Sequence, residues 1–337
     1  MKKKLKVISL FSGCGGMDLG FRGDFDFLNK HYDRNNYEII FANDILKHAC
    51  ETYEINFNHK AWCGDVKDLD YSNLPDADIV IGGFPCQDFS LAGKRKGLDA
   101  ERGRLYLEMK KIIEYVKPIA FVAENVDGIR ISKKGEDTSA LDTIVKDFKS
   151  SGYKVVYKVL NAADYGVPQN RKRVIIVGIR NDIDAEMNYP KITHGLPNQP
   201  FVTAKDAIDD LWDKIDDPSI MNHTFKDYSK AAFYDDGRGQ GNCQIRADKP
   251  SPTIRSEHHG NIEGHYRSYD DKHPNDRNKW RRLSVRECAR LQSFPDNFKF
   301  PHAASTSYKE IGNAVPPVLA WNIAKALYES LKNKTSD

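Results

Sequence analysis

Residues 5–21, LKVISLFSGCGGMDLGF, combine the three elements from which an α/β protein is built. The first part is short, apolar and rich in branched side chains, as in a buried strand, and the last part begins a helix. Gly13, Gly15 and Gly16 lie between them, where glycines let a ligand approach the backbone. Their G-x-G-G spacing differs from the G-x-G-x-x-G of dinucleotide sites and disfavours a nicotinamide oxidoreductase, while a merely tight turn remains an alternative.

The same alternation of strand and helix signals continues to about residue 180. Strands alternating with helices predict a parallel sheet with helices on both faces. The expected strands cover residues 5–11, 37–44, 77–85, 119–126 and 173–180, and the expected helices between them cover 45–57, 103–118 and 143–153.

The character of the chain changes near residue 188. Up to about residue 280 the sequence is rich in Pro, His, Asp, Asn and Gly, which predicts a loop-rich second unit with short strands. Helical signals return at 280–295, where Ser284 and Glu287 form a capping-box pattern, and at 314–331.

Composition excludes several classes of protein. The chain has 337 residues, 40% of them hydrophobic, which is enough for an ordinary core. Six scattered cysteines without a C-x-x-C pair argue against a structural zinc site or a disulfide framework, and favour a reducing, cytoplasmic location. The N-terminal apolar run is too short for a signal peptide, and no run approaches the length of a membrane span. A net charge of +3 permits nucleic-acid binding without arguing for it.

The stretch GGFPCQDFS, residues 82–90, places Cys86 just past the end of an expected strand. Open α/β sheets carry their chemistry at that edge, so Cys86 is a candidate nucleophile. Pro85 removes a backbone donor and restricts the approach to the thiol. A buried cysteine acting as a small hydrophobe is the alternative.

Other polar residues follow strand ends as well. Asp44 and Asp65 are suited to ribose hydroxyls and an adenine amino group, which together suggest an adenosine-containing ligand. Glu124, in AENV, can reach the same cleft as Cys86 and act as an acid. Arg171 and Arg173, in QNRKR, alternate and should share one face of an extended segment. Each residue alone also has a non-functional interpretation. The acids could be solvated or cap a helix, and the arginines could belong to a basic surface edge.

Taken in order, FSGCGG, GGFPCQDFS, AENV, QNRKR, RRLSVRECARLQSFP and IGNAVPP resemble the motifs of the C5 DNA-cytosine methyltransferase family. The resemblance runs from residue 7 to about 320. It implies a Rossmann-like S-adenosylmethionine-dependent methyltransferase with a mixed sheet and a smaller, loop-rich, mainly β target-recognition domain. The implied boundaries are 1–190 plus 300–337 for the catalytic, cofactor-binding domain, 191–280 for target recognition, and 281–299 for the connecting segment.

The resemblance also implies the chemistry. Cys86 would add to cytosine C6, Glu124 would hold or protonate N3, and Arg171, with Arg173 nearby, would help at O2. S-adenosylmethionine would donate the methyl group, with its carboxylate at the start of the first helix. Ile45 departs from the aromatic residue common after the ribose acid. The residues implied to bind the cofactor are Phe11, Ser12, Gly13, Gly15, Gly16, Asp44, Ile45, Asp65, Val66, Pro85, Asn313 and Ala314.

The resemblance implies duplex DNA as the substrate. A cytosine inside a duplex must then be flipped out to meet Cys86. A restriction endonuclease of the same specificity is the expected functional partner, without a stable complex, and the protein is expected to be a monomer. No metal is expected, because His258 and His259 lack a third ligand. Candidate DNA contacts are Gln87, Ser90, Lys94, Arg95, Arg246, Thr253, Arg255, His258 and Asn261.

Two alternatives accompany this interpretation. One branch of the same family methylates cytosine in transfer RNA, and the long 191–280 segment favours DNA over it. A DNA-binding protein that kept the fold without activity is the other, and the presence of Cys86, Glu124 and Arg171 argues against it.

Overall fold

The computed structural model describes residues 4–85, 105–132, 138–228, 244–256, 266–268, 272–273 and 276–332. Seven of the predicted site residues lie outside these ranges: Cys86, Gln87, Ser90, Lys94, Arg95, His258 and Asn261. Within the described part of the chain, no helix is both long enough and apolar enough to cross a membrane.

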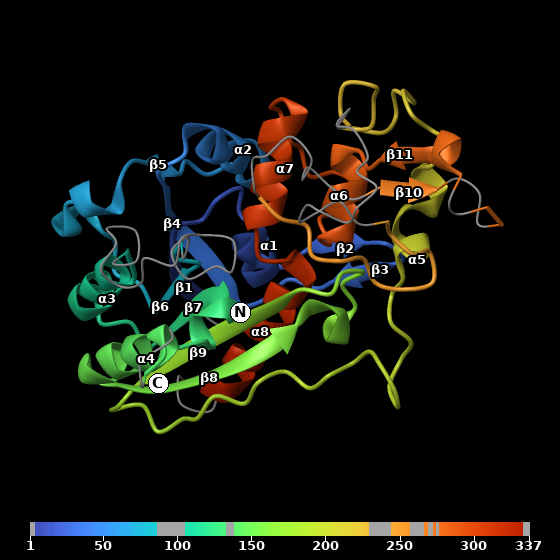
Figure 1. Cartoon of the computed structure of the whole chain (residues 1–337). Coiled ribbons are helices and arrows are strands. Elements are labelled where there is room, and N and C mark those ends of the chain that lie inside the picture. The colour runs from blue at the N-terminus through green and yellow to red at the C-terminus, as the bar shows by residue number, and fades with distance from the viewer. Residues whose placement is uncertain are drawn as a thin grey trace.

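A seven-stranded sheet forms the centre of the described residues, in the order β5-β4-β1-β6-β7-β9-β8 (Figure 1). Neighbours from β5 to β7 are parallel, as the alternation predicts. β9 is antiparallel to both β7 and β8, which makes the sheet mixed. The strands are β1 (Leu5–Leu10), β4 (Tyr37–Asp44), β5 (Trp62–Cys63), β6 (Ile79–Gly82), β7 (Ala120–Val126), β8 (Tyr153–Asn161) and β9 (Lys172–Arg180).

Helices cover both faces of the sheet, as predicted. Successive side chains of a strand point to opposite faces, so Val7 joins one buried cluster with α8, and Ile8 joins another with α3 and α4. α1 and α8 pack closely because Gly20 has no side chain: a Cβ there would lie 2.6 Å from the Pro317 carbonyl oxygen. The helices are α1 (Gly16–Arg22), α2 (Lys47–Phe57), α3 (Leu105–Val116), α4 (Ala140–Ser150), α5 (Ala204–Ile208), α6 (Val285–Leu291), α7 (Ala304–Asn313) and α8 (Pro317–Leu331).

The second half of the chain adds short elements at one end of the molecule (Figure 1). Among them, β10 (Tyr266–Ser268) pairs antiparallel with β11 (Trp280–Arg282). The first half of the chain contributes another small antiparallel pair, β2 (Phe25–Phe27) with β3 (Lys30–Tyr32). Trp212, Ile245 and Ile254 are buried in the same cluster as α8. The described part of 191–280 therefore shares its core with one face of the sheet.

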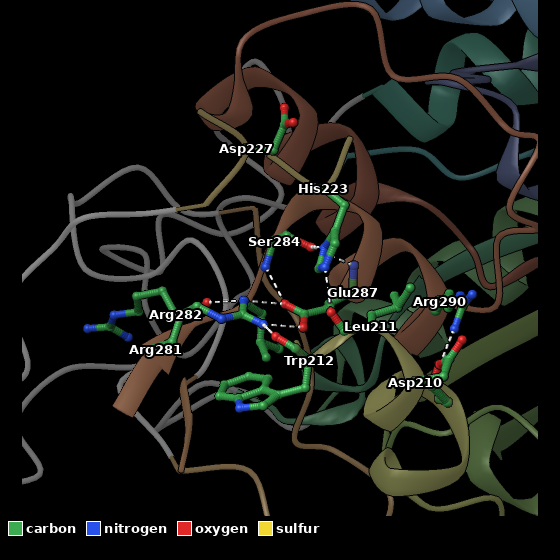
Figure 2. Close-up of polar contacts among 12 residues, drawn as sticks. Asp210, Leu211, Trp212, His223, Asp227, Arg281, Arg282, Ser284, Glu287 and Arg290 are labelled. Atoms are coloured by element: carbon green, nitrogen blue, oxygen red, sulfur yellow. Dashed lines mark hydrogen bonds and ion pairs between the residues drawn. The ribbon is translucent and has the colours of Figure 1, made fainter. Parts of the chain in front are cut away.

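The connecting segment 281–299 contains the predicted capping box (Figure 2). Ser284 N donates to Glu287 Oε2 at 2.6 Å, and Glu287 N donates to Ser284 Oγ at 3.1 Å. Arg281 Nη1 and Nη2 each donate to a different oxygen of Glu287 at 2.8 Å, and the Arg281 guanidinium lies 3.9 Å from the Trp212 ring centroid. The start of α6 is thereby fixed to Arg281 of β11, which in turn lies over Trp212.

Candidate active site

The glycine turn after β1 is fixed to the end of the neighbouring strand β4. Ser12 N donates to the Asn43 carbonyl at 2.8 Å, and Gly13 N donates to Asp44 Oδ2 at 2.9 Å. Gly13 has φ +56, which favours glycine, and a Cβ there would meet no atom within 4 Å. The backbone at Gly13 therefore faces open space, as a ligand-binding turn requires.

Asp44 is buried at the end of β4, with 9% of its surface exposed. Its second oxygen, Oδ1, accepts from Leu46 N at 2.9 Å. Burial raises the pKa of Asp44, and the hydrogen bonds from Leu46 and Gly13 oppose that shift. The adjacent Ile45 is 61% exposed, so an apolar surface lies beside this carboxylate.

The turn after β5 brings Asp65 to the same edge of the sheet. Gly64 N donates to the Asp44 carbonyl at 3.0 Å, which ties this turn to β4. Asp65 is half-buried and accepts from Lys67 N at 3.0 Å, while Val66 is buried. Asp44 and Asp65, which were predicted to bind the ribose and the adenine, therefore lie at the same edge of the sheet.

Ala314 and Val315 lie against Gly16 of the glycine turn although they are far away in sequence. A Cβ added to Gly16 would be 2.9 Å from the Ala314 Cβ and 2.5 Å from the Val315 carbonyl oxygen, so only glycine permits this contact. Asn313, also predicted to bind the cofactor, is the exposed last residue of α7. Phe11, with φ 53, is half-buried at the start of the turn.

Glu124, near the end of β7, lies beside the strand end that leads to Cys86. Its Oε1 is 2.8 Å from Arg173 Nε, and both side chains are nearly buried. A Cβ added to Gly83 would be 3.1 Å from Glu124 Oε2. Asn125 Nδ2 donates to the Phe84 carbonyl at 3.0 Å, and the half-buried Pro85 follows. A carboxylate–guanidinium pair is therefore held at the approach to Cys86.

The two predicted arginines have different surroundings. Arg173 contacts Glu124, whereas Arg171 is 1% exposed and donates from Nη1 to the Ile254 carbonyl at 2.9 Å and from Nη2 to the Gly312 carbonyl at 2.7 Å. Burial lowers the pKa of Arg171 well below its usual value, and Arg173 adds to the shift. The structure thus brings Arg173, rather than Arg171, to Glu124.

Three predicted DNA contacts fall within the described residues. Arg246 is exposed and its Nη2 lies 3.0 Å from Asp248 Oδ2, so an ion pair occupies it. Thr253 Oγ1 donates to the Asn170 carbonyl at 2.6 Å. Arg255 is exposed. Burial is the main cause that lowers the pKa of Arg173, and the charge of Arg255 lowers it further. The 251–256 segment therefore lies closer to the Glu124–Arg173 pair than the sequence could indicate.

Gln169 is a residue that sequence reasoning did not single out. It is fully buried, its Nε2 donates to the Leu291 carbonyl at 3.1 Å, and its Oε1 accepts from Ile254 N at 3.1 Å. Gln292 accepts from it at 2.6 Å and donates to the Ala314 carbonyl at 2.6 Å. The signal in the sequence that could have indicated its structural role is a glutamine at the start of QNRKR, just before the apolar run of β9.

Comparisons with known proteins agree with this geometry. The sequence profile of the C-5 cytosine-specific DNA methylases matches residues 5–329. The chain is 36% identical to the type II methyltransferase M.FnuDI of Fusobacterium nucleatum, over 98% of this chain and 96% of that protein. It is also 36% identical to the type II methyltransferase M.BsuRI of Bacillus subtilis, over 96% of this chain and 79% of that protein.

Solved structures show the same fold. The methyltransferase EhMeth of Entamoeba histolytica matches with a TM-score of 0.71 at 16% identity, over 98% of this chain and 99% of that one. The S. pombe Dnmt2 methyltransferase matches with a TM-score of 0.69 at 19% identity, over 97% and 99%. With the profile and the curated relatives, the conclusion is that this chain belongs to the C-5 cytosine-specific DNA methylase family and is a DNA (cytosine-5-)-methyltransferase.

Proposed function

We propose that this enzyme methylates C5 of a flipped-out cytosine within one short sequence of duplex DNA, using S-adenosylmethionine. The observation that carries the proposal is the position of the Glu124–Arg173 pair beside Gly83, which follows β6, the strand between β7 and the glycine turn of β1 that Asp44 closes. A polar pair suited to a base and a turn suited to an adenosyl group thus lie at the same edge of the sheet, one strand apart.

The residues at the glycine turn fit S-adenosylmethionine, which supplies the methyl group when bound. Both oxygens of Asp44 already accept one backbone N–H, and a carboxylate oxygen has a second acceptor site that a ribose hydroxyl can use. The exposed Ile45 offers an apolar surface to an adenine, and Asp65 offers an acceptor to its amino group. Open space at Gly13 leaves room for the ligand.

Cys86 is the proposed nucleophile and directly follows Pro85 in the chain. Its thiolate forms a bond to cytosine C6, and the resulting enamine makes C5 nucleophilic. C5 would then take the methyl group of S-adenosylmethionine, whose S–CH3 bond would break to leave S-adenosylhomocysteine. Loss of the C5 proton and cleavage of the sulfur–C6 bond release 5-methylcytosine and regenerate the thiolate.

Glu124 and Arg173 are proposed to make addition at C6 easier. Glu124 holds or donates a proton at cytosine N3, which accepts electron density as the thiolate adds. Arg173 fixes the orientation of that carboxylate through the contact between Nε and Oε1 at 2.8 Å. It also places a cation beside the pyrimidine, where O2 would gain negative charge.

Recognition of DNA is assigned to residues 191–280, with 1–190 and 300–337 forming the catalytic domain and 281–299 the connection. The position of Thr253 and Arg255 near the catalytic pair supports this division. Lys94 and Arg95 are proposed to contact phosphates while the base is flipped. The curated type II relatives support a role in a restriction–modification system, protecting DNA from an endonuclease of the same specificity. The cytoplasm is the location proposed for it.

Incubating purified protein with S-adenosylmethionine and a plasmid, followed by bisulfite sequencing, tests the proposal. The expected result is protection of cytosine at one short sequence, and an RNA substrate serves as the comparison. Cys86→Ala should abolish transfer while S-adenosylmethionine still binds, as measured by calorimetry. Protection at no defined sequence, or undiminished turnover by Cys86→Ala, would contradict the proposed reaction.

A further inference from the structure

Arg171 is a buried cation with an unusual set of partners. The two terminal nitrogens donate to neutral backbone carbonyls, those of Ile254 and Gly312. Its Nε is buried and has no hydrogen-bond partner among the residues that the structure describes. After burial, which lowers the pKa of Arg171, the charge of Arg173 lowers it further and that of Glu124 raises it. Burying a cation is costly unless it is paired, so the contribution of Arg171 to stability does not by itself account for it.

The two carbonyls that Arg171 holds belong to different parts of the protein. Ile254 lies in the 251–256 segment, within the part of the chain assigned to DNA recognition. Gly312 lies two residues before Ala314, which packs together with Val315 against Gly16 of the glycine turn. One guanidinium therefore connects the recognition segment to the cofactor end of the pocket.

The junction between these two segments is tightly packed. A Cβ added to Gly312 would lie 2.5 Å from the Arg255 carbonyl oxygen and 2.6 Å from Ser256 N. Thr253 Oγ1 donates to the carbonyl of Asn170, the residue before Arg171. Because close-packed groups transmit displacements, a change at Arg171 moves both segments relative to Arg173 and Glu124.

We propose that Arg171 is a positioning residue for methyl transfer, which sets the 251–256 segment and residues 312–314 against the Glu124–Arg173 pair. The inference rests on the proposed function and assigns Arg171 an indirect role. Arg171 acts through the Ile254 and Gly312 carbonyls and makes no contact with the base.

Arg286 offers a matched control. It is also fully buried and donates from Nε, Nη1 and Nη2 to the carbonyls of Met221, Pro295 and Phe298 at 3.0, 3.0 and 2.7 Å. It therefore resembles Arg171 in burial and in the chemistry of its partners. Its partners include neither the recognition segment 251–256 nor residues 312–314.

The experiment compares Arg171→Lys with Arg286→Lys in the full chain, at a temperature where near-UV circular dichroism shows both to be folded. A lysine ammonium lacks the planar fork that reaches two carbonyls, so both variants should lose stability. Arg171→Lys should also lose at least about tenfold in kcat, since a misplacement of about 1 Å can cost roughly 100-fold. Arg286→Lys should keep kcat, and KM for both DNA and S-adenosylmethionine, within about twofold.

Gly312→Ala opens the same junction from the other side and should reproduce the loss in kcat, which keeps the test informative if Arg171→Lys does not fold. Unchanged kcat in folded Arg171→Lys or Gly312→Ala would overturn the proposal. An equal loss in Arg286→Lys would overturn it too, by showing a general effect of lost stability. An inactive wild-type protein would instead count against the proposed function.

Discussion

In the part of the chain that the structure describes, two Arg–Glu pairs are largely shielded from solvent, one at the candidate site and one in the connecting segment. In the connecting segment, both oxygens of Glu287 accept from Arg281, Oε2 also accepts from Ser284 N, and the guanidinium stacks on Trp212 (Figure 2). At the site, Arg173 Nε contacts Glu124 Oε1, while Oε2 faces Gly83. The same two residue types thus hold a helix start in one place and face the proposed cleft in the other.

Replacing Glu124 should produce the largest effect. Glu124→Gln keeps the shape of the side chain but cannot donate the acid proton, so kcat should fall about 10²- to 10⁴-fold. Stability should fall less than in Glu287→Gln, because the amide oxygen can keep the single contact that Glu124 Oε1 makes with Arg173 Nε. Single-turnover methylation assays and denaturant unfolding measure the two quantities. A loss of stability with preserved turnover would reverse the roles of the two pairs.

Glu287→Gln is the matched change in the connecting segment. The amide retains one acceptor oxygen where the carboxylate accepts three bonds, and it removes the Glu287 charge from the buried Arg281 cation. We expect a loss of roughly 3–5 kcal/mol in the free energy of unfolding. Turnover per folded molecule should stay near the wild-type value. Urea unfolding with activity normalised to the folded fraction checks this, and a large loss in normalised kcat would contradict it.

The Glu310 carboxyl lies on α7, outside both Arg–Glu pairs, and contacts α2. Glu310 Oε1 is 2.7 Å from His48 Nδ1, and Oε2 accepts from Thr52 at 3.0 Å, so α7 is joined to α2 beside Asp44. Burial raises the pKa of Glu310 to about 7. The folded protein then binds the proton more tightly than the unfolded chain does.

The contribution of Glu310 to stability is therefore present at low pH and is lost as the pH rises from about 4.5 to about 7. Up to about 3 kcal/mol is at stake, at 1.36 kcal/mol for each pKa unit. Glu310→Gln removes this titration, so its free energy of unfolding should fall less steeply across that window. Parallel pH profiles of wild type and variant in urea unfolding would disprove the shift.

Much of the fold could be predicted from the sequence because β1, β6, β7 and β9 are apolar runs largely buried on both faces, and β4 has an apolar run that ends in buried residues. β8 was missed since it is half-exposed and interrupted by lysines, and α7 was missed since its sequence, ASTSYKEIGN, is largely polar. Asp44 and Glu124 follow strand ends, so their placement was predictable.

The partners of Arg171 and Arg173 could not be predicted, because spacing alone does not give the register of an antiparallel pair. Val126 lies opposite Arg173 in the β7–β9 pair, and this register brings Arg173 near Glu124. Arg171 lies before β9, where its partners come from segments 83 and 141 residues away in sequence. Contacts over such separations depend on how the whole domain packs.

The smallest effect is expected at His223, at the edge of the connecting segment (Figure 2). Its Nε2 is 2.7 Å from the Leu211 carbonyl, which can only accept, so Nε2 carries the proton. Nδ1, 2.7 Å from Ser284 Oγ, then accepts from that hydroxyl. Burial lowers the pKa of His223, and Arg281 and Arg290 add to the effect while Glu287 opposes it.

Because the folded pKa lies below the unfolded value of about 6.5, the contribution of His223 is fully present above pH 6.5 and is lost as the pH falls below it. His223→Gln can keep an acceptor for Ser284 and a donor for Leu211 without titrating. The difference in unfolding free energy between wild type and this variant should therefore shift in favour of the variant between about pH 6.5 and 5. A difference that stays constant over this range would show that the network at Ser284 tolerates a charged imidazole, and that Glu287 rather than His223 determines the stability of this region.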